Sequence, residues 1–181
     1  KTEQTFDIAE TLSTLGMMQL ELGDFEHGME NLDTALTLNE QIGNKSAVAV
    51  ILNNLGWVYK LQGDLDHSLT FIQQSMAIRR KIATEESTRI QLANIGVIFR
   101  QKGDFQQALS YLQRALILAE KVGNINEIAL ILYYLVIVHL DMNQTEPAQK
   151  NLERLSQLYE QSSGNKIIGH RFQIASALLT K

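Results

Sequence analysis

The chain has 181 residues, enough for one domain with a sizeable core, and its 45% hydrophobic and 20% charged residues are ordinary for a globular protein. The formal net charge of −4 argues against a nucleic-acid partner, because domains that bind nucleic acids carry an excess of Lys and Arg. The absence of cysteine excludes a disulfide framework, a thiolate nucleophile and a cysteine zinc site, and it is compatible with a cytoplasmic location.

The first helical pattern starts at Phe6, after a polar and frayed segment from Lys1 to Thr5. Gly23-Asp24 ends this helix, and a second helix runs from Phe25 to Ile42 before Gly43-Asn44. A single proline and many Leu, Ala, Gln and Glu residues favour an all-α chain. Since the chain starts with Lys and no signal segment follows, we expect an excerpt of a longer protein or a processed form.

This two-helix pattern restarts every 40 residues. Three glycines hold one place in the first helix, and valine holds it in the fourth copy: Gly16, Gly56, Gly96 and Val136. The turn after the first helix aligns as Gly23-Asp24, Gly63-Asp64, Gly103-Asp104 and Asn143-Gln144. Core places align as Leu15, Leu55, Ile95 and Leu135 in the first helices, and as Leu32, Ile72, Leu112 and Leu152 in the second. A fixed period over four copies indicates a repeat array.

The breakers predict nine helices, no strand and four repeats, over about residues 6–44, 45–84, 85–124 and 125–164, followed by a terminal helix within residues 165–181. No linker interrupts them, so we expect a single domain covering residues 1–181. Asp24, Asp64 and Asp104 can cap the second helices by accepting from free backbone N–H groups. Thr145 can do so in the fourth copy, with Pro147 in the first turn.

These residues resemble the tetratricopeptide repeat. The third copy fits the family pattern with Leu92, Ile95-Gly96, Phe99, Ala108, Leu112 and Ala115. The family period is about 34 residues, and the longer period here, with the segment 52–59, looks like the long-helix subclass of kinesin light chains, spindle-orientation adaptors and bacterial quorum-sensing regulators. HEAT and armadillo arrays have similar periods but lack the Gly-Asp turn. The resemblance implies a right-handed α-solenoid, or superhelix, whose first helices line a concave peptide-binding groove.

By position in the family, this groove would hold one set of side chains from the first helices. They are Met17, Asn53, Asn54, Trp57, Lys60, Asn94, Val97, Arg100, Tyr133, Tyr134 and Ile137. Asn54 and Asn94 are one repeat apart, so we expect them to lie side by side. An Asn amide both donates and accepts, and the resemblance implies that these two grip a peptide backbone. The alternative is that both only bond to the adjacent repeat.

Two further alignments in the groove have alternative interpretations. Met17, Trp57, Val97 and Ile137 form one ladder, which either packs into the core or presents Trp57 as an anchor for a partner. Lys60 and Arg100 are either two solvated charges or a site that attracts an acidic group of the ligand.

No pattern in the sequence favours catalysis, a metal or a cofactor. His27 and His67 align, but Gln107 and Pro147 continue their ladder, so a solvent-facing role is favoured over a metal site. The apolar run 128–138 is too short to span a bilayer. The leading hypothesis is therefore a non-catalytic scaffold for a protein or peptide segment, within a larger protein. The alternative is a ligand- or peptide-sensing regulatory domain of a signalling or transcription regulator.

The terminal helix, Ile167 to Leu179, is apolar on two faces. Ile168, Phe172, Ala175 and Leu179 form one stripe, and Ile167, Ile174 and Leu178 lie largely off it. A solvating last helix needs only one apolar face, because its outer face meets water. We therefore expect self-association through this helix, unless the second set folds back onto the fourth repeat.

Overall fold

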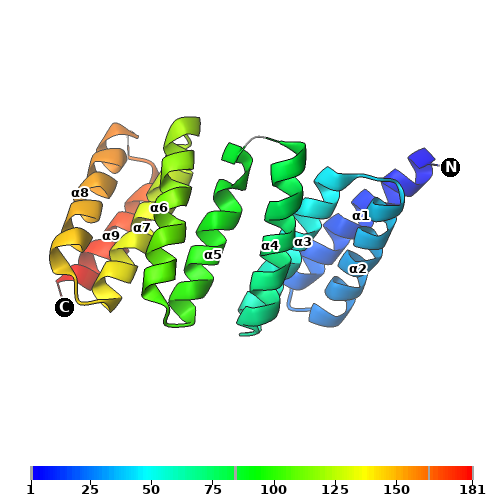
Figure 1. The fold of residues 1–181 in the computed structure, drawn as a ribbon, viewed down its shortest axis with the longest axis horizontal. Coiled ribbons are helices and arrows are strands. Elements are labelled where there is room, and N and C mark those ends of the chain that lie inside the picture. Colours follow the sequence, from blue (N-terminus) through cyan, green and yellow to red (C-terminus); the bar gives the residue numbers. More distant parts are fainter. Residues whose placement is uncertain (1, 84, 163, 181) are drawn as a thin grey trace. The chain divides into compact units, whose positions relative to one another are not determined.

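The computed structural model describes residues 2–83, 85–162 and 164–180. Over these ranges the chain forms nine α-helices, one short 3-10 helix and no strand, which confirms the all-α prediction (Figure 1). The chain divides into two compact units, Lys1–Thr84 and Glu85–Lys181, at the boundary expected between the second and third repeats. The single domain expected from the sequence stays a prediction.

Unit 1 contains the first two helix pairs. The helices are α1 (Thr2–Glu21), α2 (Phe25–Gln41), α3 (Lys45–Leu61) and α4 (Leu65–Ile82). α1 packs on α2, α3 packs on α4, and α2 packs on α3. α1 begins at Thr2, so the expected start at Phe6 is wrong, while Lys1 lies outside the described residues. The segment before Phe6 has neither Gly nor Pro, and spacing of apolar residues cannot reveal a polar first turn.

Unit 2 contains the other two pairs and the terminal helix. Its helices are η1 (Glu85–Thr88), α5 (Arg89–Gln101), α6 (Phe105–Val122), α7 (Ile125–Asp141), α8 (Thr145–Gln161) and α9 (Lys166–Leu179). α6 packs on α7, and α9 packs on both α7 and α8. The 3-10 turn η1 precedes α5 and shortens it, a detail that the repeat pattern did not indicate. The terminal helix begins within one residue of its expected start.

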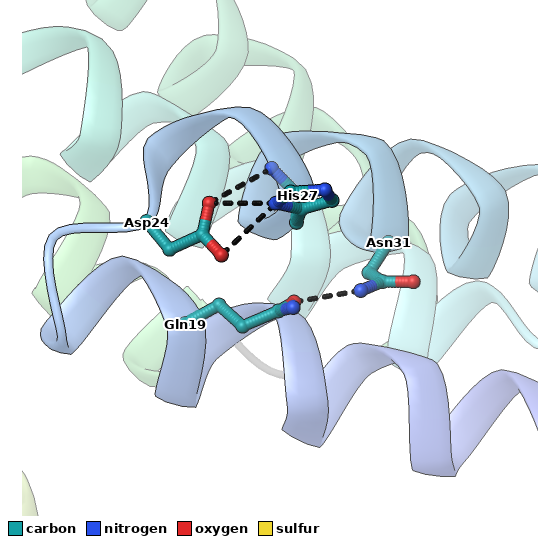
Figure 2. Close-up of polar contacts among 4 residues, drawn as sticks. All are labelled: Gln19, Asp24, His27 and Asn31. Atoms are coloured by element: carbon teal, nitrogen blue, oxygen red, sulfur yellow. Dashed lines mark hydrogen bonds and ion pairs between the residues drawn. The ribbon is translucent and has the colours of Figure 1, made fainter.

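The turn inside the first pair shows how the chain reverses direction. Gly23 has φ of 85°, a left-handed conformation that favours glycine. The backbone N–H of His27 then donates to the Asp24 carboxylate at 3.3 Å, which caps α2 (Figure 2). The imidazole Nδ1 of His27 lies 2.9 Å and 3.0 Å from the two carboxylate oxygens. The Asn31 amide donates to Gln19 at 2.7 Å and links the two helices.

The expected caps hold for three of the four second helices. Asp64 and Asp104 accept from the backbone of α4 and α6 as Asp24 does for α2. The prediction that Thr145 caps α8 is wrong, because a capping residue precedes the helix and α8 already begins at Thr145. Gln144 stands at the cap position without a side-chain bond to the helix, and Thr145 is the first helical residue. Pro147 lies in the first turn, as expected, where a missing N–H is harmless.

Small residues bring the two helices of a pair close together. A Cβ added to Gly16 would lie 2.8 Å from the carbonyl oxygen of Gly28, and one added to Gly28 would lie 2.9 Å from the carbonyl oxygen of Gly16. Both distances are too short for a real side chain. The two backbones of the first pair therefore meet where neither residue has a side chain.

The aligned core places are buried inside the array but not at α1. Leu55 and Ile95 are fully buried, whereas Leu15 is 43% exposed. Leu55 lies in α3, against which α2 packs, and among the described residues no helix covers the corresponding face of α1. In the same described ranges, every helix is too short or too polar to span a lipid bilayer.

Replacing Leu55 with Ala should lower the free energy of unfolding by about 2–5 kcal/mol, because truncation of a fully buried leucine leaves a cavity. Leu15→Ala is the matched control, with the same residue type at the same repeat place. It should cost about 1 kcal/mol or less, since the Leu15 side chain already meets solvent. Urea unfolding followed by circular dichroism measures both. Equal losses for the two variants would contradict the burial of Leu55.

The Asp24–His27 contact should make stability depend on pH. The hydrogen bond to Asp24, followed by its charge, raises the pKa of His27 above 6.5, and the same hydrogen bond lowers the pKa of Asp24 below 3.8. The His27 contribution is complete below pH 6.5 and is lost as pH rises through the raised pKa. The Asp24 contribution is present above pH 3.8 and is lost as pH falls. The pair should therefore stabilise the fold most between these two values.

Asp24→Asn should accordingly lower the melting temperature more at pH 6 than at pH 9, and it should lower the pKa of His27 measured by NMR. Asp104→Asn is the control, because Asp104 caps α6 through Gln107 and no imidazole takes part. Its effect should be equal at the two pH values. An unchanged His27 pKa in Asp24→Asn would rule out the contact.

Candidate functional site

The predicted site residues of unit 1 lie on α1 and α3. Helical spacing of three and four residues puts Asn53, Asn54 and Trp57 on one face of α3, with Lys60 one turn further. Met17 comes from α1, and all five side chains are half-buried. We call Met17, Asn53, Asn54, Trp57 and Lys60 the unit 1 surface.

Trp57 and Met17 serve the core as well as this surface. Both side chains pack against the buried cluster that includes Leu20, Leu32 and Leu55. The core interpretation of their ladder therefore holds in part, since each is half-buried and also reaches solvent. The indole N–H of Trp57 makes no hydrogen bond to any residue that the structure describes, and a tryptophan N–H usually has a partner when it is buried.

Asn54 and Lys60 also have unused hydrogen-bonding capacity. The side-chain amide of Asn54 makes no hydrogen bond within the described ranges, whereas Asn53 already has a partner within the chain. No carboxylate of the described residues pairs with Lys60, and burial lowers the pKa of its ammonium. Lys60 therefore differs from the fully solvated charge that was one of the two interpretations of the sequence. It is a half-buried cation without a counter-ion in this part of the chain.

In unit 2 the aligned cation already has a partner. The Nε of Arg100 on α5 donates to Asp141 on α7 at 2.6 Å, and each side chain is only about 30% exposed. An intramolecular carboxylate therefore neutralises Arg100, which is neither a solvated charge nor an unpaired one. An acidic ligand would have to displace Asp141 to use it.

Two tyrosines lie close to this ion pair on the surface of unit 2. The rings of Tyr133 and Tyr134 meet edge to face with centroids 5.4 Å apart. Burial, and then the nearby Tyr133, raise the pKa of Tyr134, while Arg171 and Arg100 oppose this shift. Arg171 comes from α9, and its guanidinium donates to the carbonyl oxygen of Asn126 at 3.3 Å. Burial lowers the pKa of Arg171.

The remaining predicted residues of unit 2 present little accessible surface or free hydrogen-bonding capacity to a binding partner. Val97 and Ile137 are each only 8% exposed, so their ladder faces the core in this unit. Asn94 is half-buried and already has a partner within the chain. A binding role for these three residues stays a prediction, and so does the expected stacking of Asn94 beside Asn54, which belongs to unit 1.

The sequence reasoning missed two charged residues, Glu10 and Arg171. Glu10 holds the repeat place that Val50 and Ile90 hold in the next two copies, so a charge at an otherwise apolar place was the available signal for it. Arg171 aligns with a ladder of mixed polarity, Thr11, Ile51, Gln91 and Ile131, which carries no such signal. The interpretation of His27 and His67 as solvent-facing holds, because both are exposed and each contacts an aspartate. Within the described ranges, no three potential metal ligands lie together.

Comparisons with solved structures show the same fold. Aspartyl phosphate phosphatase F from Bacillus subtilis matches with a TM-score of 0.87 at 12% identity, over 96% of this chain and 45% of that chain. A signal-transduction ATPase with a tetratricopeptide repeat sensor, from Pyrococcus horikoshii, matches with a TM-score of 0.80 at 20% identity, over 96% of this chain and 26% of that chain. A kinesin-light-chain-like protein from Podosopora anserina, built of nearly identical repeats, has a TM-score of 0.68 at 14% identity, with 93% of each chain covered.

At these identities the structural likeness shows the fold alone, and the chain spans less than half of the first two proteins. A search of curated proteins found no match. Tetratricopeptide repeats are in general non-catalytic scaffolds for protein interactions. The family model of the tetratricopeptide repeat matches residues 7–81 and 87–161, which is most of the sequence, and the chain therefore belongs to the tetratricopeptide repeat family.

Proposed function

We propose that this chain is a non-catalytic module that binds a peptide or protein segment on the first helices of its repeats. The observation that carries the proposal is the unused polar capacity of the unit 1 surface. Asn54, Trp57 and Lys60 are half-buried, and the polar atom of each side chain has no partner among the described residues. Partial burial of a polar group without a hydrogen-bond partner costs free energy, and a ligand that supplies the missing hydrogen bond offsets this cost.

Each of these side chains suits a different part of an extended segment. The Asn54 amide can donate to one peptide carbonyl and accept from one peptide N–H. The Trp57 ring is a rigid apolar anchor with one donor. The Lys60 ammonium can meet a carboxylate, and its low hydration in the half-buried state strengthens that pairing. We propose that the module belongs to a larger protein in the cytoplasm, which the absence of cysteine fits.

A second candidate function is a sensor domain that binds a small peptide or metabolite and controls an attached effector. The likeness in fold to the repeat sensor of the Pyrococcus horikoshii ATPase and to the Bacillus subtilis phosphatase favours it. The binding surface would be the same. The two functions differ in the consequence of binding, so an effector domain in the same protein would favour the sensor.

Peptides selected from a displayed random library should bind through the unit 1 surface. Asn54→Ala should weaken binding of a selected peptide by about 3- to 10-fold, the effect of losing one or two hydrogen bonds, with little change in melting temperature. Trp57→Ala should weaken it further. Fluorescence anisotropy measures the affinities.

The control variant is Gln74→Ala, which removes an exposed amide from the second helix of the same repeat and should leave affinity unchanged. If the Asn54 variant instead loses stability while each folded molecule binds normally, Asn54 has a structural role and the proposed surface is wrong.

We also propose that the chain self-associates through α9. Ile168 and Ala175 are buried against the rest of unit 2, whereas Ile167, Ile174 and Leu178 are exposed. Several large aliphatic side chains on one outer face favour association. Sedimentation should show dimers or larger species at high concentration, and Ile174→Glu with Leu178→Glu should give monomers. A wild type that stays monomeric, with a destabilised variant, would identify α9 as a cap.

A further inference from the structure

The acidic residues of this chain are distributed very unevenly. Residues 2–44, which form the first helix pair, contain nine Asp and Glu residues and neither Lys nor Arg. Residues 45–181 contain eleven acidic and fifteen basic residues. The overall charge of −4 therefore hides a strongly acidic first pair. Such a concentration of one sign attracts cationic groups and raises their rate of encounter.

A small cavity opens between the two first helices of unit 1. Its volume is about 220 Å³, and its lining includes Phe6, Glu10 and Ser13 of α1, Val50 and Ile51 of α3, and Asn39 of α2. Pockets for drug-sized ligands usually measure about 300–1,000 Å³, so this cavity suits a single side chain. It belongs to one compact unit, which fixes its walls relative to one another.

The exposed wall surface is mainly apolar, with polar groups from Ser13, Thr14, Asn39 and Asn44, and Glu10 is the one charged group in the lining. Ile51 is fully buried behind the cavity, while Phe6 and Val50 are large, exposed apolar side chains. The exposed carboxylate of Glu10 forms no ion pair with any described residue. Asn39 is buried, but its amide donates to the carbonyl of Ala35 and accepts from Asn44, so the amide needs no ligand. The cavity thus places an exposed anion without an ion pair beside a mainly apolar wall.

The cavity continues the unit 1 surface. Glu10, Ser13 and Met17 follow one another on a single stripe of α1, at spacings of three and four residues. Val50, Asn54 and Trp57 do the same on α3. A segment bound along Asn54 and Trp57 therefore has a side-chain cavity beside it on the same two helices.

We infer that this cavity takes a Lys or Arg side chain of the bound segment. The aliphatic stem packs on Phe6 and Val50, as the stems of these residues do on apolar surface elsewhere. The cationic head group pairs with Glu10, and Phe6 can add a cation–π contact. An acidic side chain would be repelled by the nine carboxylates of this pair, and a neutral one would leave Glu10 unpaired. This inference rests on the proposed function and names the chemistry of the segment.

The test uses the blocked pentapeptide Ac-Ala-Ala-Arg-Ala-Ala-NH2 and its norleucine counterpart, which keeps an aliphatic chain and lacks the charge. In ¹H–¹⁵N NMR titrations, the arginine peptide should shift the amides of Glu10, Ser13 and Val50, and the norleucine peptide should not. Glu10→Gln should weaken arginine-peptide binding by about fivefold or more, the usual effect of losing a charge-assisted hydrogen bond.

Glu21→Gln is the matched control, because it removes the same charge from an exposed position on α1 outside the cavity. It should change the affinity less than about twofold, the effect of a screened surface charge. Raising the salt concentration should weaken binding of the arginine peptide to the wild type.

Four outcomes would overturn the inference. The peptides could bind equally, which would make the cavity a purely apolar site. The two Gln variants could weaken binding equally, which would leave only general attraction to an acidic surface. The arginine peptide could fail to shift the cavity amides up to its solubility limit. The same amides could shift with protein concentration alone, which would identify a second copy as the occupant.

These results separate from the test of the proposed function. If the selected library peptides bind through Asn54 and Trp57 while the arginine peptide ignores Glu10, the inference fails and the proposed function stands. If the arginine peptide binds at Glu10 while the library peptides are insensitive to Asn54 and Trp57, the proposed surface is wrong and the cavity stands.

Discussion

Close packing within each helix pair is the constraint on which both units depend. In the first pair the backbones meet at Gly16 and Gly28, where a Cβ on either residue would collide with a carbonyl oxygen. In the second pair the space opposite Gly56 is taken by the side chain of Ile72, and the hydroxyl of Ser68 donates to the Gly56 carbonyl at 2.6 Å. A first helix held this tightly directs its remaining faces toward the neighbouring repeat and toward solvent.

Packing between neighbouring repeats explains why one residue type can have two environments. Leu55 and Leu15 hold the same repeat place, yet only Leu55 is covered by a preceding second helix. Each repeat buries its face only against its neighbours, so burial depends on position in the array as much as on residue type. Burial of apolar surface contributes about 25 cal/mol for each Å². The fully buried Leu55 side chain therefore contributes more to the stability of the fold than the partly exposed Leu15 side chain.

Charges on the first helices follow a comparable logic. In unit 2 a carboxylate on α7 reaches Arg100 on α5, and the ion pair closes within the unit. In unit 1 the half-buried Lys60 and the exposed Glu10 have no such partner in the described part of the chain. Unit 2 therefore neutralises the cation at this repeat place, whereas unit 1 offers an unpaired cation on α3 and an unpaired anion on α1. The offered charges make unit 1 the better candidate for binding a partner.

The helices, their period and most of their ends could be predicted from the amino-acid sequence. Glycines at left-handed turn positions and aspartates that cap the next helix act through local backbone chemistry, so their spacing is legible without a structure. The resemblance of the repeat pattern to a known family then identified the fold, and the family match confirms it.

The surroundings of each candidate residue, by contrast, follow from how the helices pack together. It buried Val97 and Ile137 while leaving Trp57 half-exposed in the same ladder, because burial depends on neighbouring helices. It also joined Arg100 to Asp141, brought Glu10 to a cavity beside Phe6 and Val50, and left Thr145 without the capping role that its place had suggested. Alignment of the repeats identifies the side chains that hold equivalent positions. It does not predict the residues around each of them, because those depend on the contacts between helices.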